Sequence, residues 1–112
     1  MHQEIPTEES LKLLQQSLPE KHIIILKFTA DWCGPCKRIA SDYERLSLQY
    51  TDIVFLKVNV DNSPDISGKY KVRSMPTFVF LNNNNVYATT VGASLPMIEN
   101  NLETLNEIVN KI

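Results

Sequence analysis

The sequence Ala30-Asp31-Trp32-Cys33-Gly34-Pro35-Cys36-Lys37 holds the only two cysteines of the chain, separated by glycine and proline. An apolar run, residues 23–28, leads into it, and residues 39–50 follow it with apolar side chains at helical spacing. A Cys-x-x-Cys pair between a strand and a helix, in a βαβ-like pattern, is typical of a redox centre that alternates between dithiol and disulfide.

The spacing predicts different environments for the two sulfurs. One helical turn brings them together and puts Cys33 at the helix N-terminus, where unpaired N–H groups and the helix dipole favour a thiolate. We expect Cys36 to lie further inside and to resolve a mixed disulfide rather than attack first. The alternatives are a pair of inert buried cysteines and half of a zinc site. Zinc needs four ligands, and His2 and His22 have neither suitable spacing nor an evident position near the loop, so we expect no metal.

Three short segments carry a resemblance to a known family. Trp32-Cys33-Gly34-Pro35-Cys36 resembles the active site of the thioredoxin family, Met75-Pro76-Thr77 its cis-proline loop, and Val91-Gly92-Ala93 its glycine near the final strand. Segment order and spacing match over nearly the whole chain. The resemblance implies an α/β protein with the thioredoxin fold, a central mixed β-sheet flanked by helices on both faces, formed by residues 1–112 as a single domain.

Length, charge and hydropathy limit the class of protein. The 112 residues suit one domain, and eleven basic against thirteen acidic side chains give a net charge of −2, which argues against a nucleic acid partner. The first six residues lack the basic and apolar regions of a signal peptide. The longest apolar run, residues 23–26, is too short to span a bilayer. We therefore expect a cytoplasmic protein with no membrane partner, and in that compartment a cysteine pair is more often catalytic or metal-binding than structural. We also expect a monomer.

The remaining sequence predicts helices alternating with strands. Thr7 can cap a first helix that ends at Pro19, Ser63 caps a short helix that runs to about Tyr70, and Ser94 caps the last helix. The expected strands are residues 23–29, 53–60, 77–81 and 86–91, with Asn82-Asn83-Asn84-Asn85 as a hairpin turn. The expected buried helix positions are Leu11, Leu14 and Leu18, then Ile39, Tyr43, Leu46 and Tyr50, and finally Ile98, Leu102, Leu105, Val109 and Ile112.

The resemblance implies roles for individual residues. It makes Cys33 the nucleophile and Cys36 the resolving cysteine, joined in a redox disulfide. The family's substrate-binding positions correspond here to Trp32, Gly34, Pro35, Met75, Pro76 and Gly92.

Simpler interpretations of these positions remain open at the level of sequence. Trp32 could be a core aromatic instead of part of a docking surface. Gly34 and Pro35 could form a generic turn. Pro76 could be an ordinary proline at a strand start, although the resemblance implies a cis bond opposite the cysteines. Gly92 could relax a strand end or allow close approach of a substrate.

The sequence departs from the family at three positions. Ser41 replaces a proline that kinks the active-site helix, Asn84 replaces a hairpin glycine, and Lys27 replaces a buried aspartate. By resemblance Lys27 lies behind Cys36, close to Lys57. Burial and a like charge both disfavour its ammonium form. Lys27 could therefore be a neutral proton acceptor, a charged group that reaches toward water and tunes the thiol, or a strand-end lysine without a chemical role.

The resemblance implies a reductase of disulfide-containing client proteins. Such an enzyme takes part in electron transport and cell redox homeostasis, and an NADPH-dependent thioredoxin reductase recycles it. The chain has no Gly-rich phosphate loop, and we expect no bound cofactor. The alternative is a thioredoxin-like adaptor that docks a partner while its disulfide turns over slowly. An oxidase or isomerase ranks third, because Gly-Pro between the cysteines favours reduction by resemblance.

Overall fold

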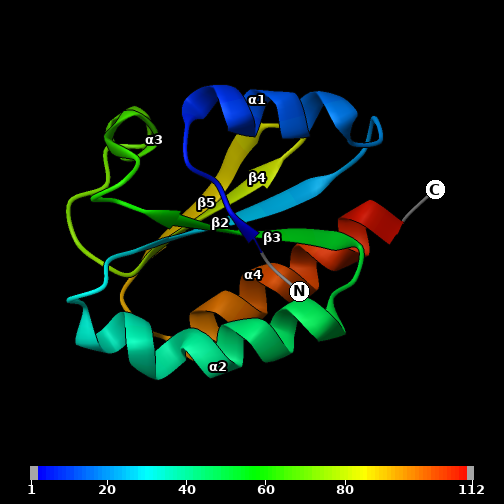
Figure 1. The fold of residues 1–112 in the computed structure, drawn as a ribbon. Helices are drawn as coiled ribbons and strands as arrows, with labels where there is room; N and C mark the ends of the chain where they lie inside the picture. Colours follow the sequence, from blue (N-terminus) through cyan, green and yellow to red (C-terminus); the bar gives the residue numbers. More distant parts are fainter. Residues whose placement is uncertain (1–2, 111–112) are drawn as a thin grey trace.

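A mixed β-sheet of five strands forms the centre of the computed structural model, which describes residues 3–110 (Figure 1). The sheet order is β1-β3-β2-β4-β5, with β1, β2 and β3 parallel to one another and β4 antiparallel to both β2 and β5. The strands are β1 Gln3–Glu4, β2 Ile23–Thr29, β3 Ile53–Asn59, β4 Thr77–Asn82 and β5 Asn85–Val91. The helices are α1 Glu8–Ser17, α2 Gly34–Gln49, α3 Pro64–Lys69 and α4 Leu95–Asn110. This architecture confirms the predicted fold.

The central strand β2 is apolar on both of its faces, which is why it lies in the middle of the sheet. Ile23 and Ile25 pack with residues of α2 and α4, whereas Ile24, Leu26 and Phe28 pack with residues of α1 and α3. Figure 1 shows these two helix pairs on opposite sides of the sheet. Within residues 3–110, no helix is both long and apolar enough to cross a membrane.

Most predicted boundaries are confirmed, but β1 was not predicted. Its two residues pair with β3, and the backbone N–H of Ile5 then donates to Lys57 O at 2.8 Å. The predicted strand 53–60 ends one residue earlier, at Asn59. Leu14, Leu18 and Val109 are only partly buried, in contrast to the prediction. Ile112 lies outside the described residues.

The hairpin turn is narrower than predicted. Asn82 and Asn85 pair in the ladder, which leaves Asn83 and Asn84 as the turn, with φ angles of 50° and 72°. Asparagine tolerates this left-handed region better than most residues. The turn is also tied to the start of β2, because Asn83 Oδ1 accepts from the His22 N–H at 2.8 Å and Asn84 Oδ1 lies 2.8 Å from His22 Nε2. The turn therefore has a structural role that the sequence pattern did not indicate.

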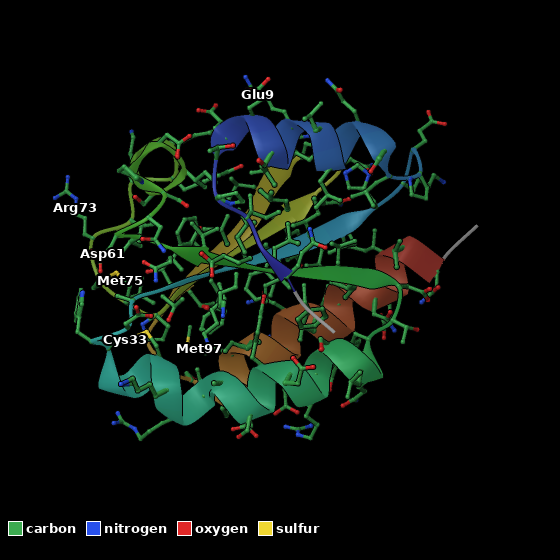
Figure 2. All side chains as sticks on the ribbon, viewed as in Figure 1. Glu9, Cys33, Asp61, Arg73, Met75 and Met97 are labelled. Atoms are coloured by element: carbon green, nitrogen blue, oxygen red, sulfur yellow. A yellow bond between two sulfur atoms is a disulfide. The ribbon has the colours of Figure 1, made fainter. Side chains whose placement is uncertain are left out.

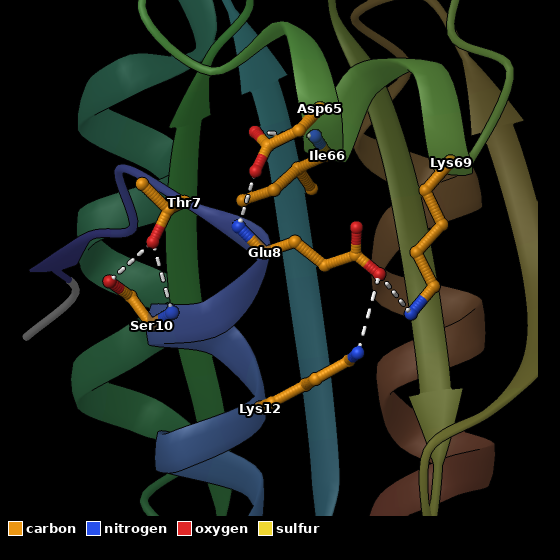
Figure 3. Close-up of polar contacts among 7 residues, drawn as sticks. All are labelled: Thr7, Glu8, Ser10, Lys12, Asp65, Ile66 and Lys69. Atoms are coloured by element: carbon orange, nitrogen blue, oxygen red, sulfur yellow. Dashed lines mark hydrogen bonds and ion pairs between the residues drawn. The ribbon is translucent and has the colours of Figure 1, made fainter.

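One carboxylate joins α1 to α3 (Figure 3). Asp65 Oδ2 accepts from the backbone N–H of Glu8, and Asp65 Oδ1 from that of Ile66, both at 2.8 Å. The hydrogen bond from Glu8, followed by that from Ile66, holds the pKa of Asp65 below its ordinary value of 3.8. Thr7 supplies the predicted cap of α1, since its Oγ1 accepts from the Ser10 N–H at 3.0 Å.

Asp65→Ala should lower the midpoint of urea unfolding at neutral pH, because two helix N-terminal N–H groups lose their acceptor. A lowered carboxyl pKa contributes stability above 3.8 that is lost as the pH falls through the folded-state pKa. The difference between Asp65→Ala and the parent should therefore shrink as the pH falls below 3.8. Asp52→Ala, which removes an exposed carboxylate in the turn before β3, is the control. A difference that persists unchanged in acid would contradict this role of the ionised carboxylate.

Candidate functional site

Cys33 is the N-cap of α2. The preceding strand β2 ends at Thr29, and Cys33 N–H donates to Ala30 O at 3.1 Å, which turns the chain into the helix. Cys33 Sγ then accepts a hydrogen bond from the backbone N–H of Cys36 at 3.2 Å. Pro35 lies in the first turn, where its fixed φ suits the helix and its missing N–H costs no hydrogen bond. The helix start therefore directs a donor at this sulfur, and such donors stabilise a thiolate.

A disulfide joins Cys33 to Cys36, with their Cα atoms 5.3 Å apart. The exposed fractions of the two residues are 3% and 2%, so depth does not separate the two cysteines as strongly as expected. They differ instead in their place on the helix. Cys33 caps it, whereas Cys36 lies within its first turn and contributes its own N–H to the capping bond.

The loop before β4 contacts the cysteines. The Met75–Pro76 bond is cis, which confirms that expectation, and Met75 packs against Ala30, Cys33 and Cys36. Gly92 is linked to this loop because its N–H donates to Pro76 O at 2.8 Å. The φ of Gly92 is 99°, while a Cβ placed there would meet no atom within 4 Å. Glycine is thus required by the backbone conformation rather than by lack of space.

Trp32 is 67% exposed, so the interpretation of this residue as a core aromatic is wrong. Its Nε1–H donates to Asp61 Oδ2 at 3.0 Å, and Asp61 N–H donates in turn to Asn59 Oδ1 at 2.9 Å. Figure 2 shows Asp61, Met75 and Cys33 at the same end of the sheet. Sequence reasoning missed Asp61. The sequence could have indicated it by position. Asp61 closely follows the end of β3, and the carboxyl ends of the parallel strands β2 and β3 lie together, so Asp61 is near the loop that follows β2.

Lys27 lies behind Cys36, as predicted. It is 3% exposed, and its Nζ donates to Cys36 O at 3.3 Å and lies 5.3 Å from the centroid of the Tyr43 ring. The head group therefore points at the active-site helix. Burial, and secondarily the charge of Lys57 on the neighbouring strand, lower the pKa of Lys27 to about 8. Such an amine can exchange a proton near physiological pH.

Tyr43 is a second residue that sequence reasoning placed only in the core. Its hydroxyl donates to Leu56 O at 2.7 Å and lies 3.3 Å from Ile25 O, so the side chain joins α2 to both β3 and β2. Burial raises its pKa well above the ordinary value, which keeps the hydroxyl protonated as a donor. Its ring forms one wall around the Lys27 ammonium. Within residues 3–110, no three His, Cys, Asp or Glu side chains group as a metal site requires.

Comparisons with known proteins agree with this geometry. Residues 6–104 match the family model described as Thioredoxin. Thioredoxin-T of Drosophila melanogaster is 48% identical over 81 residues, which cover 71% of this chain and 52% of that protein, so the match spans about half of its length. Thioredoxin H3 of Arabidopsis thaliana is 39% identical over 101 residues, 90% of this chain and 83% of that protein. The solved structure of Fasciola hepatica thioredoxin is 30% identical, with a TM-score of 0.87 over 91% of this chain and 97% of that one.

In the reduced protein, limiting iodoacetamide at neutral pH should alkylate Cys33 several-fold faster than Cys36. The reason is that only Cys33 Sγ receives the N–H donor at the start of α2. Peptide mass spectrometry after short labelling times measures both rates, with Cys36→Ser and Cys33→Ser as single-thiol controls. Preferential labelling of Cys36 would reverse the assignment.

Lys27→Met should slow the attack of Cys36 on a mixed disulfide more than the first attack by Cys33. If Lys27 accepts the Cys36 proton, we expect its loss to slow this step by about tenfold, less than the full contribution of a general base, because the Lys27 contact is with Cys36 O. In the parent, the second step should accelerate as the pH rises through about 8, where Lys27 becomes neutral, and the variant should lack this contribution to the pH dependence. Stopped-flow kinetics of both steps from acid to alkaline pH provide the measurement. If the parent and Lys27→Met have equal second-step rates across that range, Lys27 has only a structural role.

Proposed function

Because the chain belongs to the thioredoxin family, we propose that it reduces disulfide bonds in client proteins by thiol–disulfide exchange. The observation that carries this proposal is the Cys33–Cys36 disulfide at the N-terminus of α2, with the Cys36 N–H directed at Cys33 Sγ. A pair held in this way can form and break its bond without moving either Cα far, since the two lie 5.3 Å apart.

The reaction has two steps. The Cys33 thiolate attacks one sulfur of the client disulfide, which forms a Cys33–client bond and releases the other client sulfur as a thiolate. Cys36 then loses its proton and attacks Cys33 Sγ, so the Cys33–Cys36 bond forms and the client leaves with both sulfurs reduced. The two electrons that the client gains come from the dithiol. Lys27, 3.3 Å from Cys36 O, is the proposed acceptor of the Cys36 proton.

The surface around the cysteines supports binding of an extended client segment. Trp32 offers exposed aromatic area fixed by Asp61. The cis loop places Met75 against the cysteines, and the bond from Gly92 holds Pro76 in place. In our proposal Trp32, Gly34, Pro35, Met75, Pro76 and Gly92 form the client-binding surface. The oxidised protein is returned to the dithiol by an NADPH-dependent thioredoxin reductase, and the cycle takes place in the cytoplasm.

The direct test of the reductase proposal is insulin reduction. With NADPH, a thioredoxin reductase and insulin, the protein should drive NADPH oxidation followed by precipitation of the insulin B chain. Cys33→Ser should abolish both signals. A parallel assay with dithiothreitol in place of the reductase separates failure of client reduction from failure of recycling. Failure in both assays would contradict the proposal, and binding without turnover would favour the adaptor alternative.

Cys36→Ser should trap client proteins as mixed disulfides on Cys33, because the second step loses its nucleophile. Lysate incubated with the variant should yield adducts that dithiothreitol releases, visible on non-reducing gels. The variant that lacks both thiols should yield none. If Cys36→Ser forms no such adducts, Cys33 does not attack clients in the way proposed.

A further inference from the structure

A pocket of about 180 Å³ lies beside Cys36, between α2 and the strands β1, β2 and β3. It is large enough to hold water. Its charged lining consists of Glu4, Lys27, Asp31, Lys37 and Lys57, so three ammonium groups share it with two carboxylates. Besides burial, the lining charge that lowers the pKa of Lys27 is that of Lys57 on the neighbouring strand.

Three of the charged residues form a row across the sheet. Glu4 on β1 pairs with Lys57 on β3, and Lys57 pairs with Lys27 on β2. Residues directly opposite on neighbouring strands point to the same face, so all three side chains lie on the α2 side. The row runs from the exposed Glu4 through the half-buried Lys57 to the buried Lys27, whose Nζ donates to Cys36 O.

Among the other groups within residues 3–110 that surround Lys27, none is a carboxylate in line with Lys27 and Lys57. From α2 it meets the Tyr43 ring and the Cys36 carbonyl, and from β4 the residue opposite is Phe78. Asp31 lines the pocket but belongs to the loop after β2, where its Oδ1 accepts from the Asn59 amide at 3.4 Å. Glu4 is therefore the carboxylate aligned with the two lysines.

We propose that Glu4 is a positioning residue for the second step of the exchange: its carboxylate, aligned with Lys57 and Lys27 across the sheet, moves to higher pH the point at which Lys27 loses its proton and Cys36 attacks. This inference rests on the proposed function. Removing the negative charge disfavours the ammonium form of Lys27, so Lys27 becomes neutral at lower pH. The proton that Cys36 loses passes to neutral Lys27 and from there to solvent.

The size of the effect follows from the sheet geometry. Two strand spacings separate the backbones of Glu4 and Lys27 by about 10 Å. A single charge at that distance, in the range of dielectric constants found near protein surfaces, shifts a titration by about 0.3 to 1 pH unit. Salt should weaken the effect, since the Debye length at 0.1 M is also about 10 Å.

The test uses the full chain and the small disulfide 5,5′-dithiobis(2-nitrobenzoate), read by stopped flow across the pH range. Attack by Cys33 releases the first thionitrobenzoate, and attack by Cys36 releases the second. Glu4→Gln should move the midpoint of the second phase to lower pH by about 0.3 to 1 unit and leave the first phase unchanged. Glu4→Asp should restore most of the parent midpoint. Glu9→Gln, which removes one exposed carboxylate on the far side of α1 (Figure 2), should move neither phase.

A double-mutant cycle makes the test specific for Lys27. Glu4→Gln should shift the second phase in the parent but not in the Lys27→Met background, because the group that responds to Glu4 is gone. Coincident profiles for Glu4→Gln and the parent would overturn the proposal, as would a shift that appears with Asp31→Asn instead. Failure of the parent to release a second thionitrobenzoate would instead contradict the exchange function itself.

Discussion

The hydrogen bond from the Cys36 N–H to Cys33 Sγ is the contact on which the site depends. It exists because β2 is buried on both faces and leaves the sheet at Thr29, and because Gly34-Pro35 then allows α2 to begin directly after Cys33. The sulfur therefore occupies the N-cap position, where most helices place an oxygen acceptor. The cis loop and Trp32 are arranged around that fixed point, the first by packing and the second through Asp61.

The buried ammonium group of Lys27 is unfavourable in this arrangement. An ammonium group in an apolar core is costly unless it is paired, and Lys57 adds a like charge beside it. The chain offsets this cost with the Cys36 carbonyl, the face of the Tyr43 ring and a pocket that can hold water. A buried lysine with a lowered pKa beside the active-site cysteines is a candidate for proton exchange.

The sequence alone predicted the sheet, the four helices and the cysteine disulfide centre, because these depend on local periodicity and on a specific short motif. It missed β1, since two polar residues show no strand pattern and are paired only through β3. It also missed the contacts of Asp61 with Trp32 and of Asn84 with His22, which join residues 29 and 62 positions apart. Such contacts follow from strand order and register, which appear only when the chain is folded.

We expect the start of α2, and not a difference in burial, to make Cys33 the reactive thiol. The most direct measurement is thiolate absorbance near 240 nm during pH titration of the two single-cysteine variants. The Cys33 thiolate in Cys36→Ser should appear at clearly lower pH than the Cys36 thiolate in Cys33→Ser. Identical titrations, or earlier ionisation of Cys36, would show that the start of α2 does not activate Cys33.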